Sequence, residues 1–220
     1  HIHETSAEIE ESLQLHGLRP LERLHRLGVL GPGLIGVHAA HLEEGEIRLL
    51  AKYDCSIAHC PSSNMKLASG IAPIVAMLEH GLRIGLGTDG AASNNRLDIF
   101  QEMRHAALLA KAVSGNAAAV GAHNVLRMAT LNGAAALGLA AKIGSIRAGK
   151  AADLCAVCLD TIETRPCYDP ASHLVYAAGR EQVSHVWVNG ILRVENGLLQ
   201  GCDTSQLLDT VNLWQNKLTA

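Results

Sequence analysis

The chain has 220 residues and a mass of 23.3 kDa, with 48% hydrophobic and 18% charged residues. A sizeable core can therefore form, which excludes global disorder. The formal net charge of −3 and the 3% of aromatic residues provide neither the basic surface nor the stacking platform expected of a nucleic-acid-binding protein. No apolar run approaches the roughly 20 residues that span a bilayer, so no membrane association is predicted.

Six cysteines are spread along the chain, at positions 55, 60, 155, 158, 167 and 202. Disulfide frameworks are typical of short secreted chains with few core residues, and this chain does not fit that class. It opens on His-Ile-His-Glu, without the basic and apolar regions of a signal peptide. Free thiols and a cytoplasmic location are therefore predicted.

Short apolar runs alternate with segments of helical spacing over the first 113 residues. The runs at 34–37, 55–58 and 82–87 predict strands, and helical spacing covers 44–53, 71–80, 97–113 and, further on, 123–131. Gly81 directly follows the second of these segments, where a helix C′ glycine is typical. This alternation of strands and helices predicts a parallel sheet.

The pattern changes from about residue 143. A turn-rich stretch leads into a predicted strand at 154–159. Two further strands at 183–188 and 191–194 are joined by Asn189-Gly190, a strong signal for a type I′ hairpin turn. Residues 203–218 return to helical spacing, with apolar residues on or near one face at Leu207, Leu208, Val211 and Leu218.

Each of the three predicted parallel strands is followed by a side chain that can carry chemistry. These residues are His38, His59 and Asp89, and His1 would be a fourth if the chain begins at the end of a strand. Because the carboxyl ends of parallel strands meet at one edge of a sheet, we expect these side chains to converge. Taken singly, each histidine also fits a hydrogen-bonded core residue, and Asp89 fits a helix cap less well than Ser93, Asn94 or Asn95.

The first four residues, His1-Ile2-His3-Glu4, are open to three interpretations. In an extended segment His1 and His3 share one face and could bind one metal ion. If a strand ends at His1, only His1 points inward and Glu4 reaches in from the loop. The third interpretation is an N-terminal remnant or tag.

Together, these residues indicate a hydrolytic metal site. Histidine and aspartate ligands around an open position suit zinc or another divalent cation. Such an ion lowers the pKa of a bound water molecule to about 7, and a carboxylate such as Glu4 could then carry protons. G-x-S-x-G, Walker A and G-x-G-x-x-G motifs are absent, so serine-hydrolase, phosphate-loop and dinucleotide functions lack support.

Four segments carry a family resemblance: residues 1–5, 37–42, 59–67 and 86–95. In this order they resemble the amidohydrolase superfamily, and within it the 5-methylthioadenosine/S-adenosylhomocysteine deaminases, near the chlorohydrolases and guanine deaminases. The resemblance implies an α/β fold, with a (β/α)8 TIM-like barrel and a small β-sandwich domain. It divides the chain into strands five to eight of the barrel (1–141), part of the β-sandwich (142–202) and a C-terminal helix (203–220).

By this resemblance His1 and Asp89 are metal ligands, and Asp89 also takes a proton from the attacking water. Glu4 is the proton shuttle to the substrate ring, and His38 contacts both the water and the substrate. His59 is a further substrate-side group, and Ser93 and Asn94 shape the loop beside the substrate.

The implied reaction is hydrolytic deamination of 5′-methylthioadenosine or S-adenosylhomocysteine, which releases ammonia and the inosine analogue. The implied cofactor is one divalent metal ion, Zn2+ first and Fe2+ or Mn2+ as alternatives. A chlorohydrolase, or a deaminase of guanine, another aminopurine or a triazine, is the alternative within the superfamily. A homo-oligomer with a small purine nucleoside as substrate is expected.

The H-x-H metal pair of the family's first strand is not found in these 220 residues, nor are strands one to four. Half of a barrel leaves unpaired strand edges and an open core. We therefore expect the chain to be the C-terminal half of a longer protein. The missing pair also leaves open a third function, that of a non-catalytic scaffold.

Overall fold

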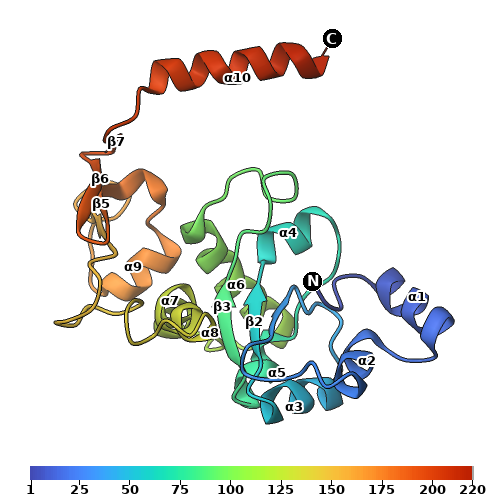
Figure 1. Cartoon of the computed structure of the whole chain (residues 1–220). Coiled ribbons are helices and arrows are strands. Elements are labelled where there is room, and N and C mark those ends of the chain that lie inside the picture. Colours follow the sequence, from blue (N-terminus) through green and yellow to red (C-terminus); the bar gives the residue numbers. More distant parts are fainter. Residues whose placement is uncertain (220) are drawn as a thin grey trace. The chain divides into compact units, whose positions relative to one another are not determined.

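A computed structural model describes residues 1–219 (Figure 1). The strands are β1 (Ile35–Val37), β2 (Ser56–His59), β3 (Arg83–Leu86), β4 (Leu154–Val157), β5 (Val183–Val188), β6 (Ile191–Glu195) and β7 (Leu198–Leu199). The α-helices are α1 (Ser6–His16), α2 (Pro20–Arg26), α3 (Glu44–Lys52), α4 (Pro61–Lys66), α5 (Ile74–Glu79), α6 (Ile99–Ser114), α7 (Ala122–Arg127), α8 (Gly133–Ala136), α9 (Pro170–Tyr176) and α10 (Thr204–Thr219). A π-helical segment, Met128–Asn132, joins α7 to α8, and Arg180–Gln182 forms a 3₁₀ turn.

The chain forms two compact units. The first contains residues 1–150 and 159–180, and the second contains residues 151–158 and 181–220. Residues 159–180 lie inside the range predicted for the β-sandwich part, yet they cluster with the first unit, where α9 packs against α6 and α7.

The first unit contains the predicted parallel sheet, with strand order β1-β2-β3 and every pair parallel. Ile2 lies beside β1: its N–H donates to the Val37 carbonyl at 3.2 Å, and its carbonyl accepts from the Ala39 N–H at 3.1 Å. The start of the chain thus extends the sheet by one parallel segment. The predicted α/β class is confirmed for this unit.

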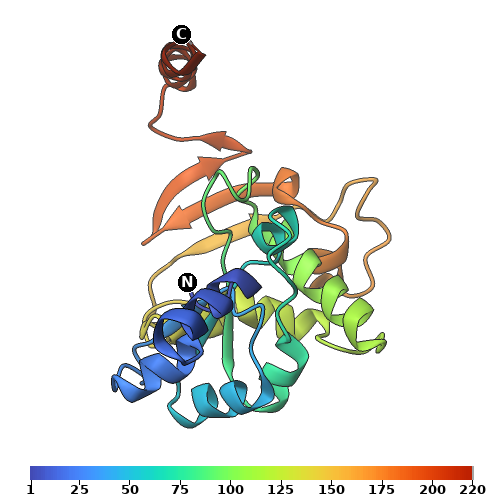
Figure 2. The same cartoon turned by 90° about the vertical axis from the view of Figure 1, so that its right-hand side faces the viewer.

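Helices α3, α5 and α6 contribute their apolar residues to one core with the sheet. Ile57 of β2 and Ile84 of β3 are fully buried in it, together with Leu50 of α3 and Met77 of α5. Figures 1 and 2 show α3 and α5 toward the opposite end of the strands from α4, which follows the carboxyl end of β2. The carboxyl edge of the sheet is therefore free to carry polar side chains.

Two helices begin later than their spacing predicted. The helix expected at 71–80 begins at Ile74, because a proline disfavours helical backbone in the residue before it and Pro73 occupies the N-cap position. The helix expected from residue 97 begins at Ile99, where Asp98 accepts hydrogen bonds from the N–H groups of residues 100 and 101. The cap is thus Asp98, and the assignment of the cap to residues 93–95 is wrong.

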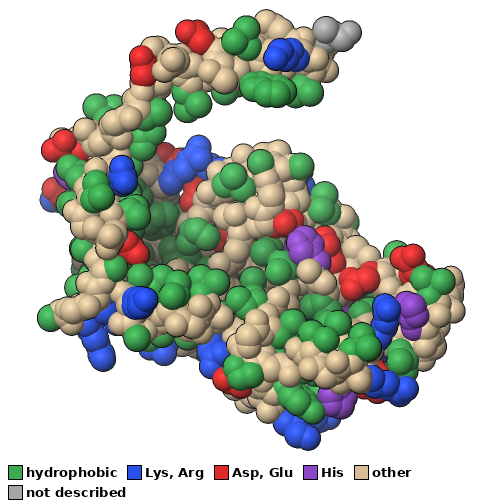
Figure 3. Space-filling model, in the orientation of Figure 1, with side chains coloured by type: hydrophobic (Ala, Val, Ile, Leu, Met, Phe, Trp, Pro, Cys, Tyr) green, Lys and Arg blue, Asp and Glu red, His purple; other side chains and the backbone are tan. Residues whose placement is uncertain are grey.

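The second unit is an antiparallel sheet of order β4-β5-β6-β7, followed by α10. Asn189 and Gly190 have φ values of 50° and 77°, as the predicted type I′ turn requires. Hydrophobic side chains line one side of α10 (Figure 3). This side includes Leu207, Val211 and Leu218, as predicted, and also Trp214.

Within residues 1–219, no helix combines the length and hydrophobicity that a bilayer span would need. All six cysteines are free thiols, as predicted.

Candidate active site

Two of the predicted site residues lie at the carboxyl edge of the sheet, where the backbone has left-handed φ values. His38 follows β1 with φ of 70°, and Asp89 follows β3 with φ of 60°. The left-handed region is uncommon for residues other than glycine, and histidine and aspartate enter it more readily than most. Such backbone recurs at functional sites, where the surrounding structure holds it in place.

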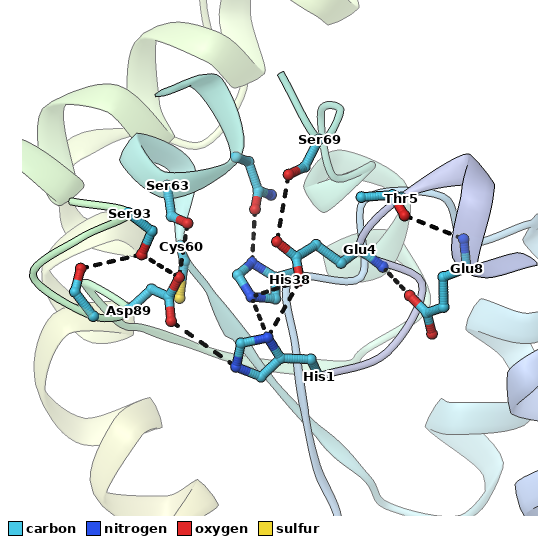
Figure 4. A network of polar contacts seen from close by, with 12 residues as sticks. His1, Glu4, Thr5, Glu8, His38, Cys60, Ser63, Ser69, Asp89 and Ser93 are labelled. Atoms are coloured by element: carbon cyan, nitrogen blue, oxygen red, sulfur yellow. Dashed lines mark hydrogen bonds and ion pairs between the residues drawn. The ribbon is translucent and has the colours of Figure 1, made fainter. Parts of the chain in front are cut away.

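His1, His38 and Asp89 lie together although they come from three different segments (Figure 4). Each offers one ligand atom, and these atoms lie within 4.8 Å of one another. His1 Nδ1 is 3.0 Å from His38 Nε2, and His1 Nε2 is 3.9 Å from Asp89 Oδ1. The sequence-based expectation that these strand ends converge is confirmed for these three residues.

This donor set fits a divalent cation such as zinc. Zinc binds histidine nitrogen and carboxylate oxygen at about 2.0–2.2 Å. One ion at those bond lengths can contact both His1 Nε2 and Asp89 Oδ1 across their 3.9 Å separation. Imidazole and carboxylate ligands do not by themselves distinguish zinc from iron or manganese.

Glu4 lies over the two histidines. Its Oε2 is 3.2 Å from His1 Nδ1 and 3.5 Å from His38 Nε2, and its Oε1 accepts from the Ser69 hydroxyl at 3.4 Å. The backbone beneath it is held by Glu8, whose carboxylate accepts from the N–H groups of His3 at 3.0 Å and Glu4 at 2.7 Å. A flexible acidic side chain is thus anchored at both its backbone and its carboxylate.

His38 is fully buried, and its hydrogen bond to Asn64 indicates which ring nitrogen carries a proton. Its Nδ1 is 2.8 Å from Oδ1 of Asn64, an oxygen that can only accept, so Nδ1 carries the proton. In the neutral ring, Nε2 is then the nitrogen without a proton, and it faces His1 and Glu4. A neutral imidazole held in one tautomer can accept a proton or a hydrogen bond at the centre of the site.

Asp89 is held by two hydroxyl groups on one of its oxygens. Ser93 and Ser63 both donate to Oδ2, the latter at 2.8 Å. The hydrogen bond from Ser93, assisted by that from Ser63, lowers the pKa of Asp89 against the opposing effect of partial burial. Asp89 is therefore a stable carboxylate, and its Oδ1 faces His1.

His3 has no part in this cluster. It is fully buried, its Nε2 accepts from the Leu21 N–H at 3.1 Å, and its Nδ1 faces Arg19 and the His41 carbonyl. Burial lowers the pKa of His3 below its usual value. Of the interpretations of the first four residues, the geometry matches the one in which His1 points inward and Glu4 reaches in from the loop.

The remaining predicted residues take different places. Ser93 contacts Asp89, as described, but the side chain of Asn94 is buried and donates to the Thr88 carbonyl and to Glu102. His59 is 2% exposed and lines a cavity of about 250 Å³ with residues of α5 and α6. Burial lowers the pKa of His59 to about 4, so it is neutral at physiological pH.

Sequence reasoning missed the residues that hold the site in place. These are Glu8, Ser63, Asn64 and Ser69. Glu8 stands three residues after the N-cap Thr5, a helix-start pattern visible in the sequence. Ser63 and Asn64 lie on α4, a short helix with Pro61 at its first turn, which apolar periodicity could not reveal.

The sequence was also compared with models of known protein families. The model of the "Amidohydrolase family" matches residues 1–192. The chain belongs to this family.

Several relatives are similar over the whole chain. A 5-methylthioadenosine/S-adenosylhomocysteine deaminase of Teredinibacter turnerae is 43% identical over 220 residues, which are 100% of this chain and 50% of the relative. A 5′-deoxyadenosine deaminase of Methanothermobacter thermautotrophicus is 41% identical over 219 residues, 100% of this chain and 51% of the relative. This amidohydrolase chain thus spans about half the length of the curated relatives it matches.

A solved structure is similar over the same extent. An adenosine deaminase from Xanthomonas campestris with bound zinc has 46% identity and a TM-score of 0.98, covering 100% of this chain and 50% of that one. The fold of this chain is therefore an amidohydrolase fold.

Proposed function

We propose that the protein is a metal-dependent hydrolytic deaminase of 5′-methylthioadenosine and S-adenosylhomocysteine. The observation that carries the proposal is the approach of His1, His38 and Asp89 to within 4.8 Å, with the Glu4 carboxylate 3.2 Å from His1 and 3.5 Å from His38. Relatives at 40–43% identity are named as deaminases of 5′-substituted or 5′-deoxy adenosines, which supports this substrate class.

His1 and Asp89 would hold the metal ion. Zinc is the first candidate, because the similar solved structure from Xanthomonas campestris has bound zinc. When bound, the ion lowers the pKa of a coordinated water molecule to about 7 and so makes a nucleophile available at neutral pH. Catalytic zinc sites use three protein ligands. Because the matched relatives are about twice as long, we expect the complete protein to supply further ligands, including an H-x-H pair.

The chain's own residues divide the proton transfers. Asp89, a stable carboxylate, accepts a proton from the attacking water. Glu4 delivers a proton to a ring nitrogen of the purine, and its 3.2 Å and 3.5 Å contacts place it beside both histidines. His38 offers its Nε2 to orient the water and the substrate, because Asn64 holds its Nδ1. General acid–base groups must lie within hydrogen-bond reach of the protons they move, and the contacts of Glu4 with His1 and His38 support its role at this site.

In this proposal the sheet of the first unit forms strands five to eight of a (β/α)8 barrel, with Ile2 on the fifth. Strands β4–β7 form part of a β-sandwich. Ser93 lies in the loop beside the substrate, and the buried side chain of Asn94 holds that loop through the Thr88 carbonyl and Glu102. A homo-oligomeric state and a cytoplasmic location remain predictions.

The test is a substrate panel with the complete protein loaded with zinc. We expect ammonia release from methylthioadenosine and adenosylhomocysteine at kcat/KM well above the values for adenosine and guanine. Chloride release from a chlorotriazine as the fastest reaction would contradict the deaminase assignment. Absence of a bound divalent metal, with no turnover of any substrate, would instead favour the scaffold.

A further inference from the structure

Glu102 on α6 is a fully buried acidic side chain that the proposed mechanism does not use. Its Oε1 accepts from Asn94 Nδ2 at 2.7 Å, and its Oε2 accepts from the backbone N–H of Ser62 at 3.0 Å. Within residues 1–219, no lysine or arginine side chain is paired with it. Burying a carboxylate without a cation costs desolvation free energy. An apolar side chain at this position would avoid that cost.

The two partners of Glu102 belong to the two segments that hold Asp89. Ser62 precedes Ser63, whose hydroxyl donates to Asp89 Oδ2 at 2.8 Å, and Asn94 follows Ser93, whose hydroxyl donates to the same oxygen. One segment is the start of α4, after β2, and the other is the loop after β3. The labelled side chains of Figure 4 show Ser63 and Ser93 converging on Asp89.

A second contact of each partner strengthens the connection. Asn94 Nδ2 also donates to the Thr88 carbonyl at 2.9 Å, next to Asp89 itself. The Ser62 hydroxyl lies 2.9 Å from Nδ1 of His105, which is also on α6. The loop that carries Asp89 and the helix that carries Ser63 are therefore both tied to one side of α6.

We propose that Glu102 is a positioning residue for Asp89. It holds the Ser63 and Ser93 hydroxyls at the spacing at which both reach Oδ2, which leaves Oδ1 directed at His1 and the metal. This inference rests on the proposed role of Asp89 as a metal ligand and proton acceptor. It also gives Asn94 a role away from the substrate, as the link between Glu102 and the Asp89 loop.

The chemistry of the two bonds explains why a carboxylate is needed. Both partners are N–H donors, and they approach different oxygens of Glu102, so each oxygen accepts one hydrogen bond. In a Glu102→Gln variant the carboxamide has one accepting oxygen, so its NH2 group meets one of the donors. Glutamine keeps the volume of the side chain. It loses one of the two hydrogen bonds, either from Asn94 or from the Ser62 N–H, and leaves that buried donor unsatisfied.

The experiment compares Glu102→Gln with wild type in the complete zinc-loaded protein, measuring the zinc dissociation constant by chelator competition and kcat and KM for methylthioadenosine. Changes in outer-shell partners of a metal site cost about 10–100-fold in metal affinity or activity. We expect zinc affinity and kcat to fall within that range while KM changes by less than about threefold. Asp169→Ala, which removes the N-cap of α9 far from Asp89 in sequence, is the control for a general loss of stability.

A Glu102→Gln variant with wild-type zinc affinity and kcat would overturn the inference, as would an equal loss in Asp169→Ala. If Glu102→Gln does not fold, Asn94→Ala decides: reduced zinc affinity at unchanged KM supports the inference, and wild-type affinity overturns it. A wild type that binds zinc without deaminating any nucleoside would reject the proposed substrate alone, because the zinc measurement still tests Glu102. A wild type that binds no divalent metal would reject both.

Discussion

Nε2 of His1 lies 3.9 Å from Oδ1 of Asp89, although β1, β2 and β3 all lie between the two residues in the sequence. The parallel sheet produces this approach, since each strand returns the chain to the same edge. The first prediction concerns this pair. Asp89→Asn keeps the shape of the side chain but removes its charge, and we expect zinc affinity of the complete protein to fall by at least about tenfold, the lower end of what even outer-shell changes cost.

Zinc content after dialysis against a chelator, measured by elemental analysis, checks this expectation. Asp54→Asn is a matched control, because Asp54 is exposed and pairs with Arg83 away from the cluster. Full zinc occupancy in Asp89→Asn would show that Asp89 is not a ligand.

The second prediction concerns the Glu4 proton shuttle. Glu4→Gln retains the hydrogen bond from Ser69 but cannot donate and accept a proton in turn. Loss of a general acid–base group typically costs about 10²–10⁴-fold, and we expect kcat to fall within that range with zinc retained. Steady-state ammonia release measures it.

Glu10→Gln provides the control for Glu4, because Glu10 is an exposed residue of α1. Surface substitutions usually change the free energy of unfolding by less than about 0.5 kcal/mol, so this variant should stay folded. We expect it to keep the kcat of the wild type. Near-normal turnover of Glu4→Gln would refute the assigned role.

The third prediction follows from the buried imidazole of His59. Its pKa is lowered from 6.5 to about 4, so the folded protein holds it neutral where the unfolded chain would protonate it. The stability due to the neutral form is present above pH 6.5 and is lost as the pH falls toward 4. The preferential protonation of the unfolded chain therefore lowers the free energy of unfolding by about 3 kcal/mol between pH 7 and pH 4.

Urea unfolding of wild type and His59→Leu at several pH values isolates this contribution, because other titrating groups are shared by both proteins. We expect the wild type to lose about 3 kcal/mol more than the variant between pH 7 and pH 4. Parallel pH dependence of the two proteins would show that His59 titrates normally.

The fourth prediction concerns the packing of β3 against α8. A Cβ atom on Gly85 would lie 3.1 Å from the Gly133 Cα, a backbone atom that cannot rotate away. Gly85→Ala should therefore lower the free energy of unfolding by about 1–3 kcal/mol.

Gly45→Ala is the opposite case, measured by the same denaturant titration. Gly45 lies in α3, is exposed, and has nothing within 4 Å of an added Cβ. Alanine is favoured over glycine in a helix by up to about 1 kcal/mol, so this variant should be as stable as wild type or more stable. Equal effects at the two positions would contradict the packing argument.

Local patterns in the sequence were sufficient for much of the fold. The apolar runs before His38, His59 and Asp89 predicted three parallel strands, and Asn189-Gly190 predicted the hairpin turn, because strand periodicity and turn geometry depend on neighbouring residues. The short helices α1, α2, α4 and α9 and the cap at Asp98 were not foreseen. Most of these helices are only six or seven residues long, too short for periodicity to show.

By itself, the sequence determined which chemical groups are available and that a parallel sheet would bring several of them to one edge. Only the tertiary structure decided which ones meet. His1 points into the cluster while His3 is buried against Leu21, and Asn94 turns to Glu102 rather than to the site. The reason is physical: the direction of a side chain at a strand end depends on left-handed backbone and on hydrogen bonds between segments distant in sequence, such as Ser63 to Asp89.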